Sequence, residues 1–195
     1  MWTASKISAG AVDKMQIKAG LLLNKFDVTN PVEPADEDII ADTTGDYTIT
    51  ATPTTEDFFA DVNHAQLNTM EGKHITGWEC SLTVTALSIT EETLALALGA
   101  SKTNENGGVS PAVDYRLADY KSVYWIGDMV DENKLFVVVM DNTVSTGGLS
   151  YTAASNGKGQ LALTLTPHAS LESYDTIPMA FYLLEKIATE DPDEV

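Results

Sequence analysis

Three segments of the chain, 46–52, 77–86 and 160–166, alternate between apolar residues and residues that are small, hydroxylated or acidic. A period of two residues is that of a β-strand, in which successive side chains point to opposite faces. The polar sides carry Asp46, Thr48, Thr50, Thr52, Glu79, Ser81, Thr83, Thr85, Gln160, Ala162, Thr164 and Thr166. The alternation therefore predicts strands with one face in a core and one face of small polar or acidic side chains, which has no groups suited to binding a ligand.

Alternation and β-forming residues predict further strands along the rest of the chain. These strands lie at 15–23, 74–87, 123–126, 134–140, 159–166 and 180–184. Two of these ranges, 74–87 and 159–166, extend segments named above. The strands at 123–126 and 134–140 are expected to pair as a hairpin. Residues 135–140 are apolar without alternation, so both faces of that strand are expected to be buried, either under a helix or against a neighbouring subunit.

One helix is predicted between Ser88 and Gly99. Ser88 and Glu91 have the spacing of a capping box, and Gly99 is suited to end the helix. Leu94 and Leu98 are expected on its buried side, together with Ile89.

The connections are polar. Residues 30–45 are expected to form a long loop, and Pro53 is expected to end the preceding strand. Residues 55–69 suit either a short helix or an irregular loop, and 101–111 suit a flexible loop. The acidic tail, 187–195, is expected to fray.

The whole chain, 1–195, is expected to form one mainly β domain, because no repeat or interdomain linker interrupts it. Its 29 acidic residues against 11 Lys and Arg give a formal charge of −18. Such a balance argues against nucleic-acid binding by phosphate neutralisation and against binding to anionic membranes. Between Asp27 and Glu71 there are eleven acidic residues and no Lys or Arg.

Motifs for catalysis or metal binding are not found in the sequence. The three histidines, His64, His74 and His168, lack the spacing of a transition-metal site, and no nucleophile elbow or phosphate-binding loop occurs. The single cysteine, Cys80, lies on an apolar strand side and is expected to be buried and inert. The longest strongly apolar run has six residues and residues 1–12 lack a signal-peptide core, so we expect a soluble protein made in a cytoplasm, with no membrane association, cofactor or enzymatic activity.

Several segments together resemble the major tail tube proteins of long, non-contractile (siphovirus-like) phage tails. They are 19–27 (AGLLLNKFD); 57–63 (DFFADVN) with Asn68 and Thr69; and 123–128 (VYWIGD) continued by Asp141, Asn142, 145–149 (STGGL), Pro167, His168 and 177–182 (IPMAFY). The resemblance implies a β-sandwich or barrel flanked by one helix, similar to the tube subunit of type VI secretion. It also implies a structural virion protein, assembled in the bacterial host cytoplasm, whose hexameric rings stack into a tail tube that conducts DNA. The implied partners are further copies of the chain and the tape measure, tail tip and tail terminator proteins.

Site residues follow as hypotheses. Residues expected to line the channel are Thr48, Thr50, Glu79, Ser81, Thr83, Thr85, Gln160 and Thr164. Residues expected in a ring-stacking loop are Pro34, Asp36, Glu37, Asp38 and Asp42, and deletion of 34–42 is expected to leave a folded monomer that cannot polymerise. Residues expected in a subunit-contact strand are Leu135, Phe136, Val137, Val138 and Val139.

Other classes of function remain open. A non-polymerising β-sandwich module for binding or adhesion would need a platform of exposed aromatics, for which Trp2, Trp78 and Trp125 are the tryptophans available. An acidic mimic of nucleic acid fits the charge but not the hydroxylated strand faces. An ordinary solvent-exposed face is the simpler explanation of those faces.

Overall fold

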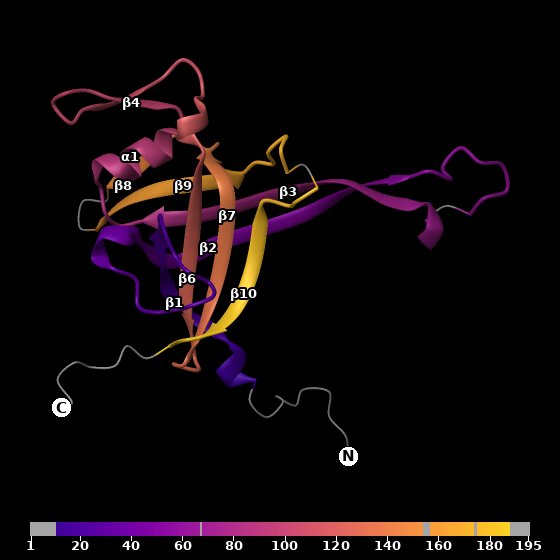
Figure 1. Ribbon diagram of the computed structural model, residues 1–195, viewed down its shortest axis with the longest axis horizontal. Coiled ribbons are helices and arrows are strands. Elements are labelled where there is room, and N and C mark those ends of the chain that lie inside the picture. Colours follow the sequence, from indigo (N-terminus) through magenta and orange to yellow (C-terminus); the bar gives the residue numbers. More distant parts are fainter. Residues whose placement is uncertain (1–10, 67, 154–156, 174, 188–195) are drawn as a thin grey trace.

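A computed structural model describes residues 11–66, 68–153, 157–173 and 175–187 (Figure 1). Its strands are β1 (Gln16–Leu23), β2 (Ile39–Asp57), β3 (Lys73–Ala86), β4 (Ser101–Thr103), β5 (Val109–Pro111), β6 (Lys121–Met129), β7 (Lys134–Ser145), β8 (Ser150–Ala153), β9 (Gly159–Pro167) and β10 (Met179–Glu185). The helix α1 (Glu91–Leu98) is accompanied by the short 3-10 turns η1 (Val12–Lys14), η2 (Asp36–Asp38), η3 (Met70–Gly72) and η4 (Leu117–Asp119). The predicted mainly β fold with one flanking α-helix is confirmed for the described residues.

Eight of the strands form one antiparallel sheet in the order β10-β7-β6-β1-β2-β3-β9-β8. The sheet also closes on itself, because the end of β7 pairs with β9 through Thr143 opposite Pro167 and Ser145 opposite Leu165. The strands β7, β6, β1, β2, β3 and β9 thus form a closed cycle of pairings, as in a barrel.

The largest apolar cluster draws residues from all six strands of this cycle and fills the space that they enclose. Its fully buried members include Leu22, Leu82, Val84, Val123, Trp125, Val138, Met140, Leu161, Leu163 and Leu165. The indole of Trp125 lies at its centre, with its ring centroid 4.4 Å from that of Tyr47 and its Nε1 donating to Thr43 Oγ1 over 3.4 Å. A Cβ atom at Gly20 would collide with this indole, so the close approach of β1 requires glycine there.

We expect Trp125→Ala to lower the free energy of unfolding by about 3–5 kcal/mol, because it empties a large buried volume in the barrel. Trp78→Ala is the matched control, since Trp78 is 39% exposed, and is expected to cost about 1 kcal/mol or less. Urea unfolding followed by circular dichroism measures both. Equal effects of the two substitutions would contradict this description of the core.

Residues 135–140 are buried from both sides within the chain itself. Val138 and Met140 point into the barrel, whereas Leu135 and Val137 belong to a second cluster on the outer face. Phe26 and Val28, from the loop after β1, cover this second cluster. The prediction that both faces are buried holds for Leu135, Val137, Val138 and Met140, whereas Phe136 and Val139 are half-buried. The covering element is a loop of the same chain and not the helix, one of the two covers expected.

The expectation of a loop over 30–45 is wrong from residue 39 onward. Ile40 is buried and Ala41 pairs with Leu22, so the apolar residues after η2 complete the barrel as the start of β2. Asp42 is a strand residue opposite Leu21.

The helix begins two residues later than predicted. Thr90, not Ser88, is the N-cap, because its hydroxyl accepts from the amide of Thr93 while the Thr93 hydroxyl accepts from the amide of Thr90. Gly99 ends the helix with φ of 69°, as predicted. Thr93 and Ala97 are its buried residues, and Leu94 and Leu98, expected on the buried side, are half-buried.

Two further differences concern Ile89 and residues 101–111. Ile89 is 50% exposed instead of lying on the buried side of the helix, because the helix begins after it. The segment expected as a flexible loop is the hairpin β4–β5, which has backbone pairing of its own and contacts α1.

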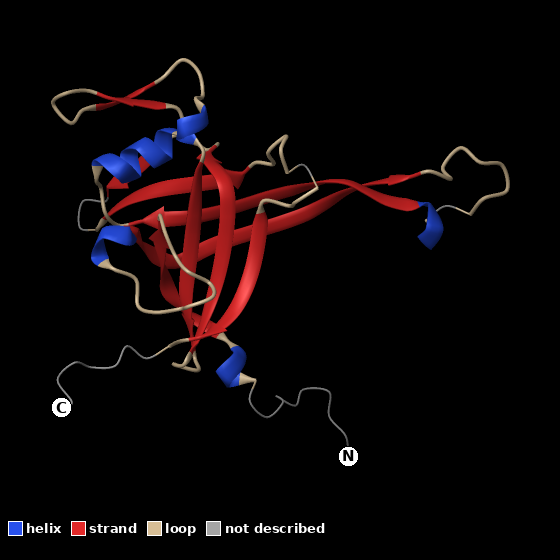
Figure 2. Cartoon of the chain, viewed as in Figure 1, coloured by secondary structure: helices blue, strands red, loops and turns tan. Residues whose placement is uncertain are grey.

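The hairpin β2–β3 extends far beyond the rest of the sheet (Figures 1 and 2). We call residues 52–79 the arm. Pro53 does not end the strand; it continues β2 opposite Trp78. Proline is tolerated there because, among the described strands, β3 alone pairs with this part of β2, so the missing N–H breaks no second ladder. Of the segment expected as a short helix or an irregular loop, residues 55–57 continue β2, and the described residues 58–66 and 68–69 form turns and irregular loop at the tip.

Candidate functional site: a hydroxylated sheet face and a projecting arm

The polar sides of the predicted strands meet on one face of the sheet. Thr83 of β3 lies opposite Thr48 of β2 and opposite Thr164 of β9, so three threonines form one row across three strands. Residues that pair directly across a ladder point to the same face. Further pairs in this face are Thr50–Ser81, Thr52–Glu79, Thr85–Ala162, Ala162–Ser150 and Gln160–Thr152. We call these residues the hydroxyl face.

The structure brings all eight predicted channel residues together on the hydroxyl face. Each is exposed or partly exposed, while the alternate residues Leu82, Val84 and Leu163 are fully or almost fully buried. Strand β8 adds Ser150 and Thr152, which the alternation pattern does not predict because the strand has only four residues. None of these residues is cationic or aromatic. Whether the hydroxyl face lines a channel stays a prediction.

The part of the sheet that carries the hydroxyl face has two open edges within the described chain. Beyond Asp42, β2 pairs with β3 alone, and β8 pairs with β9 alone. An open edge presents unpaired backbone N–H and C=O groups, which favour pairing with another strand. Both edges are therefore available to a second chain.

The tip of the arm is held in shape by Asp57. Its carboxylate accepts the amide of Asn68 at 3.0 Å and that of Phe59 at 3.1 Å. These hydrogen bonds hold the pKa of Asp57 below its ordinary value, with Lys73 adding a smaller effect. The contribution of the carboxylate to the tip is therefore present above the ordinary carboxyl pKa and is lost as the pH falls through the lowered one.

The arm exposes apolar side chains that no described part of the chain covers. Phe58 is 61% exposed although its ring stacks on His74, and Met70 is 82% exposed. Other exposed apolar residues of the arm are Phe59, Val62, Ile75 and Trp78. A two-stranded hairpin without a third strand is marginally stable alone, so this arm is suited to a partner.

The residues predicted for ring stacking are not all in a loop. Asp36 and Glu37 are exposed in η2, and Pro34 and Asp38 are half-buried nearby. Asp42 lies in β2, as described above. Deletion of 34–42 would remove strand residues that complete the barrel, so from the structure we expect the deletion variant not to fold. A contact made by the exposed acids stays a prediction.

The strand predicted for subunit contact, residues 135–139, has little surface to offer. Leu135, Val137 and Val138 are buried, and Phe136 and Val139 are half-buried. Both edges of this strand are paired, with β6 and β10. Its edge partner β10, by contrast, exposes Phe181, Tyr182 and Leu183.

The two tryptophans that the structure describes do not form an aromatic platform. Trp125 is buried in the barrel, Trp78 lies on the arm, and Trp2 lies outside the described residues. Among the described residues no group of three or more His, Cys, Asp or Glu is arranged to hold a metal ion, and no helix is long and apolar enough to cross a membrane. Cys80 is buried, as predicted, and burial raises the pKa of its thiol.

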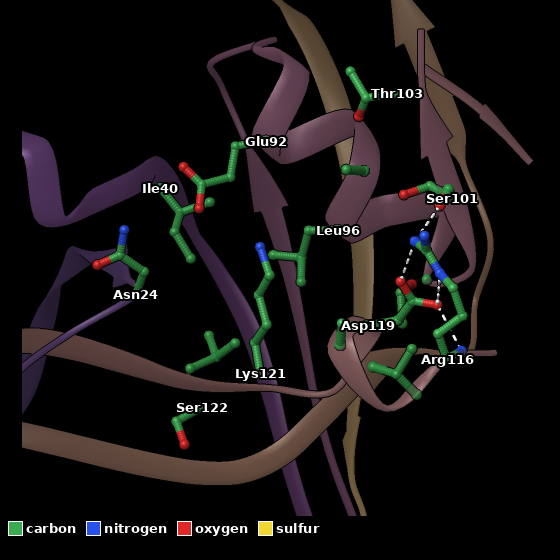
Figure 3. A pocket seen from close by; sticks show the side chains of 16 residues that line it. Asn24, Ile40, Glu92, Leu96, Ser101, Thr103, Arg116, Asp119, Lys121 and Ser122 are labelled. Carbon is green, nitrogen blue, oxygen red and sulfur yellow. Dashed lines mark hydrogen bonds and ion pairs between the residues drawn. The ribbon is translucent and has the colours of Figure 1, made fainter.

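A pocket of about 400 Å³ lies between α1, β4, η4 and β6 (Figure 3). Leu96 and Val144 contribute apolar walls, and Lys121 extends into it. The pocket also includes Arg116, whose Nη2 lies 2.6 Å from Asp119 Oδ1 and donates to the Ser101 carbonyl oxygen over 2.7 Å. The guanidinium holds the pKa of the Asp119 carboxyl below its ordinary value.

The sequence matches no protein-family model and no curated protein. Its structure is similar to a chain from the virion of a native gene transfer agent particle, with 12% identity, a TM-score of 0.41, and coverage of 84% of this chain and 95% of that chain. It is similar to a chain from the tail of an empty gene transfer agent particle with C6 symmetry, with 13% identity, a TM-score of 0.40, and coverage of 83% and 94%. It is also similar to a chain from the extended sheath–tube complex of PVC, an extracellular contractile injection system, with 11% identity, a TM-score of 0.43, and coverage of 93% and 99%.

Proposed function

We propose that this chain is a structural subunit that associates with copies of itself into rings, and that the rings stack into a phage tail tube. The observation that carries the proposal is the hydroxyl face, a continuous surface of small polar residues across four strands. In the proposed tube this face lines a channel through which DNA passes without being held. Partners at the two ends of the tube, and the location in a virion, follow from the same proposal.

The chemistry of the hydroxyl face suits a conduit for DNA. Strong contacts to nucleic acid need cations for the phosphates or aromatic rings for the bases. The face offers neither, and Glu79 adds a charge that repels phosphate. An ordinary solvent-exposed face needs only to be soluble and has no reason to exclude lysine, the most common means of protecting exposed strands.

The open strand edges supply a means of association. If the free edge of β2 in one copy pairs with the free edge of β8 in the next, the hydroxyl faces of the two copies join into one surface. This arrangement uses different surfaces of each copy, and such head-to-tail contacts close into rings when the rotation permits. Six copies are the number proposed from the sequence resemblance.

Charge sets the conditions for assembly. Each copy carries a formal charge of −18, so like charges oppose the approach of subunits. Salt screens this repulsion, because the Debye length falls from about 10 Å at 0.1 M to about 3 Å at 1 M. We expect the fraction of assembled protein to rise with salt.

Sedimentation velocity and negative-stain electron microscopy of the concentrated protein at these two salt levels test the proposal. The expected result is annular or tubular particles, more abundant at high salt. Assembly that does not change with salt would contradict the role given to charge. Protein that stays monomeric at both salt levels, and also with added tail-tip components, would contradict the proposed function.

A further inference from the structure

The barrel has an opening between β10 and β2. Strand β9 pairs with β7 only over residues 143–145, and over residues 134–140 its place beside β7 is taken by β10. Among the described strands β10 pairs with β7 alone, so no backbone ladder joins it to β2. The two strands instead border a groove of about 660 Å³, a size typical of clefts that hold a ligand.

The walls of this groove, which we call the β10 groove, are largely apolar. Tyr47 of β2, Phe136 of β7 and Leu183 of β10 line it. Phe181 extends the wall, because its ring stacks on that of Phe136. Leu183 is 69% exposed and Phe181 is 47% exposed within the described chain. Exposed apolar side chains gathered at a groove indicate an interaction site.

We propose that residues 1–10 of the same copy occupy the β10 groove, with the Trp2 side chain against its apolar wall. Trp2 is the largest apolar residue of this segment, and an aromatic side chain covers more apolar surface than any other single residue. The inference goes beyond the proposed function, because it concerns one copy and does not depend on association into tubes.

The position of η1 supports this occupant. Asp13 and Lys14 of η1 line the β10 groove themselves, so residues 1–10 precede a turn that already lies at its rim. Figure 1 shows this indigo turn near the lower ends of β7 and β10. Ten extended residues span up to about 33 Å, so the groove is within reach of Trp2.

Charge favours residues 1–10 over the acidic residues 188–195, which follow β10 in the chain. Five charged side chains line the groove: Asp13, Asp131, Glu185, Lys14 and Lys134. Carboxylates outnumber ammonium groups there, so a further acidic segment is repelled. Residues 1–10 contain Lys6 and no acidic residue, whereas 188–195 contain four acidic residues and no aromatic one.

An intramolecular disulfide tests the docking. The variant Thr3→Cys/Glu185→Cys places one thiol next to Trp2 in the sequence and one at the rim of the groove. The matched control, Thr3→Cys/Glu172→Cys, loses the same charge and carries its second thiol at an exposed position that does not line the groove. Both proteins are oxidised at low concentration, and the cross-linked monomer is measured on non-reducing gels and by peptide mass spectrometry. Cys80 is buried and common to both variants.

The expected result is at least about tenfold more cross-linked monomer in the first variant than in the control, because docking gives the two thiols a high effective concentration. Adding Trp2→Ser is expected to lower the yield to that of the control. Equal yields in the two double variants, or a yield that Trp2→Ser leaves unchanged, would overturn the proposal. Covalent dimer in place of cross-linked monomer would also overturn it, since the groove would then hold a segment of a second copy.

Glu185 and Glu172 are exposed, so both cysteine variants are expected to fold, as circular dichroism checks. The cross-link is measured on single copies and is therefore independent of assembly. Protein that forms the specific cross-link but never assembles would refute the proposed function and leave the docking intact. Tubes that form from protein without the specific cross-link would refute the docking alone.

Discussion

Replacing residues 55–76 with Asn-Gly is expected to abolish self-association while leaving the monomer folded. Thr54 lies opposite Gly77 in the β2–β3 ladder, so a two-residue turn joins the strands in register. The replaced segment belongs to neither apolar cluster, so the barrel loses none of its core. The exposed apolar side chains of the tip are removed together, and with them the surface that the arm offers to a partner.

Circular dichroism melting and sedimentation velocity measure the two parts of this expectation. A monomer with a melting temperature within a few degrees of wild type, and no assembly at high salt, is the expected outcome. A matched pair of single changes refines the test: Met70→Ser, on the arm, weakens association, whereas Leu171→Ser, which is 96% exposed elsewhere, does not. Assembly that persists without the arm would show that the arm is dispensable.

Glu79→Lys is expected to make the proposed channel retain DNA instead of releasing it. Glu79 is exposed on the hydroxyl face opposite Thr52, so the substitution replaces a repelling charge with a phosphate-binding one in every copy. Since each phosphate contact releases counterions, repeated lysines along a channel are expected to raise DNA retention at least about tenfold at low salt. Rings and tubes are expected to form as in wild type.

Glu132→Lys is the matched control, because Glu132 is exposed in the β6–β7 turn, away from the hydroxyl face, and its replacement makes the same change in net charge. Retention of labelled duplex DNA by assembled tubes, measured against salt, compares the variants. Particles that carry Glu79→Lys should also release DNA more slowly. If the two variants behave alike, or if the Glu79→Lys particles remain fully infective, the hydroxyl face does not contact DNA.

Local sequence patterns predict most of the strands and which side chains lie on each face of the sheet. The two-residue period from Gly77 to Ala86 reflects which side chains are buried, and Cys80, Leu82 and Val84 are buried as the pattern requires. The hydroxyl face was predicted for the same reason, although the pairing of its rows was not.

The features that sequence patterns did not predict depend on pairing between segments far apart in the chain. The barrel closes through β7 and β9, and no short segment shows that Ser145 lies opposite Leu165. The sequence predicts that Pro53 ends its strand because a local pattern does not show its neighbours in space; within the described part of the chain, β3 alone pairs with β2 there. The helix start was displaced because Thr90 has a reciprocal partner in Thr93, which outweighed the Ser88–Glu91 spacing.

The arm and the α1 pocket are also not predicted by local sequence patterns. A β-strand pattern reports which residues alternate but not how far a hairpin extends past its neighbours. Phe58 and Met70 resemble core residues in the sequence, and only the structure shows them exposed at the tip.

The measurement that tests the central claim most directly is a cryo-electron microscopy reconstruction of the assembled protein. We predict stacked rings in which β2, β3, β9 and β8 turn Thr48, Thr83 and Thr164 toward a central channel. Tubes with the hydroxyl face turned outward or buried between subunits would contradict the account.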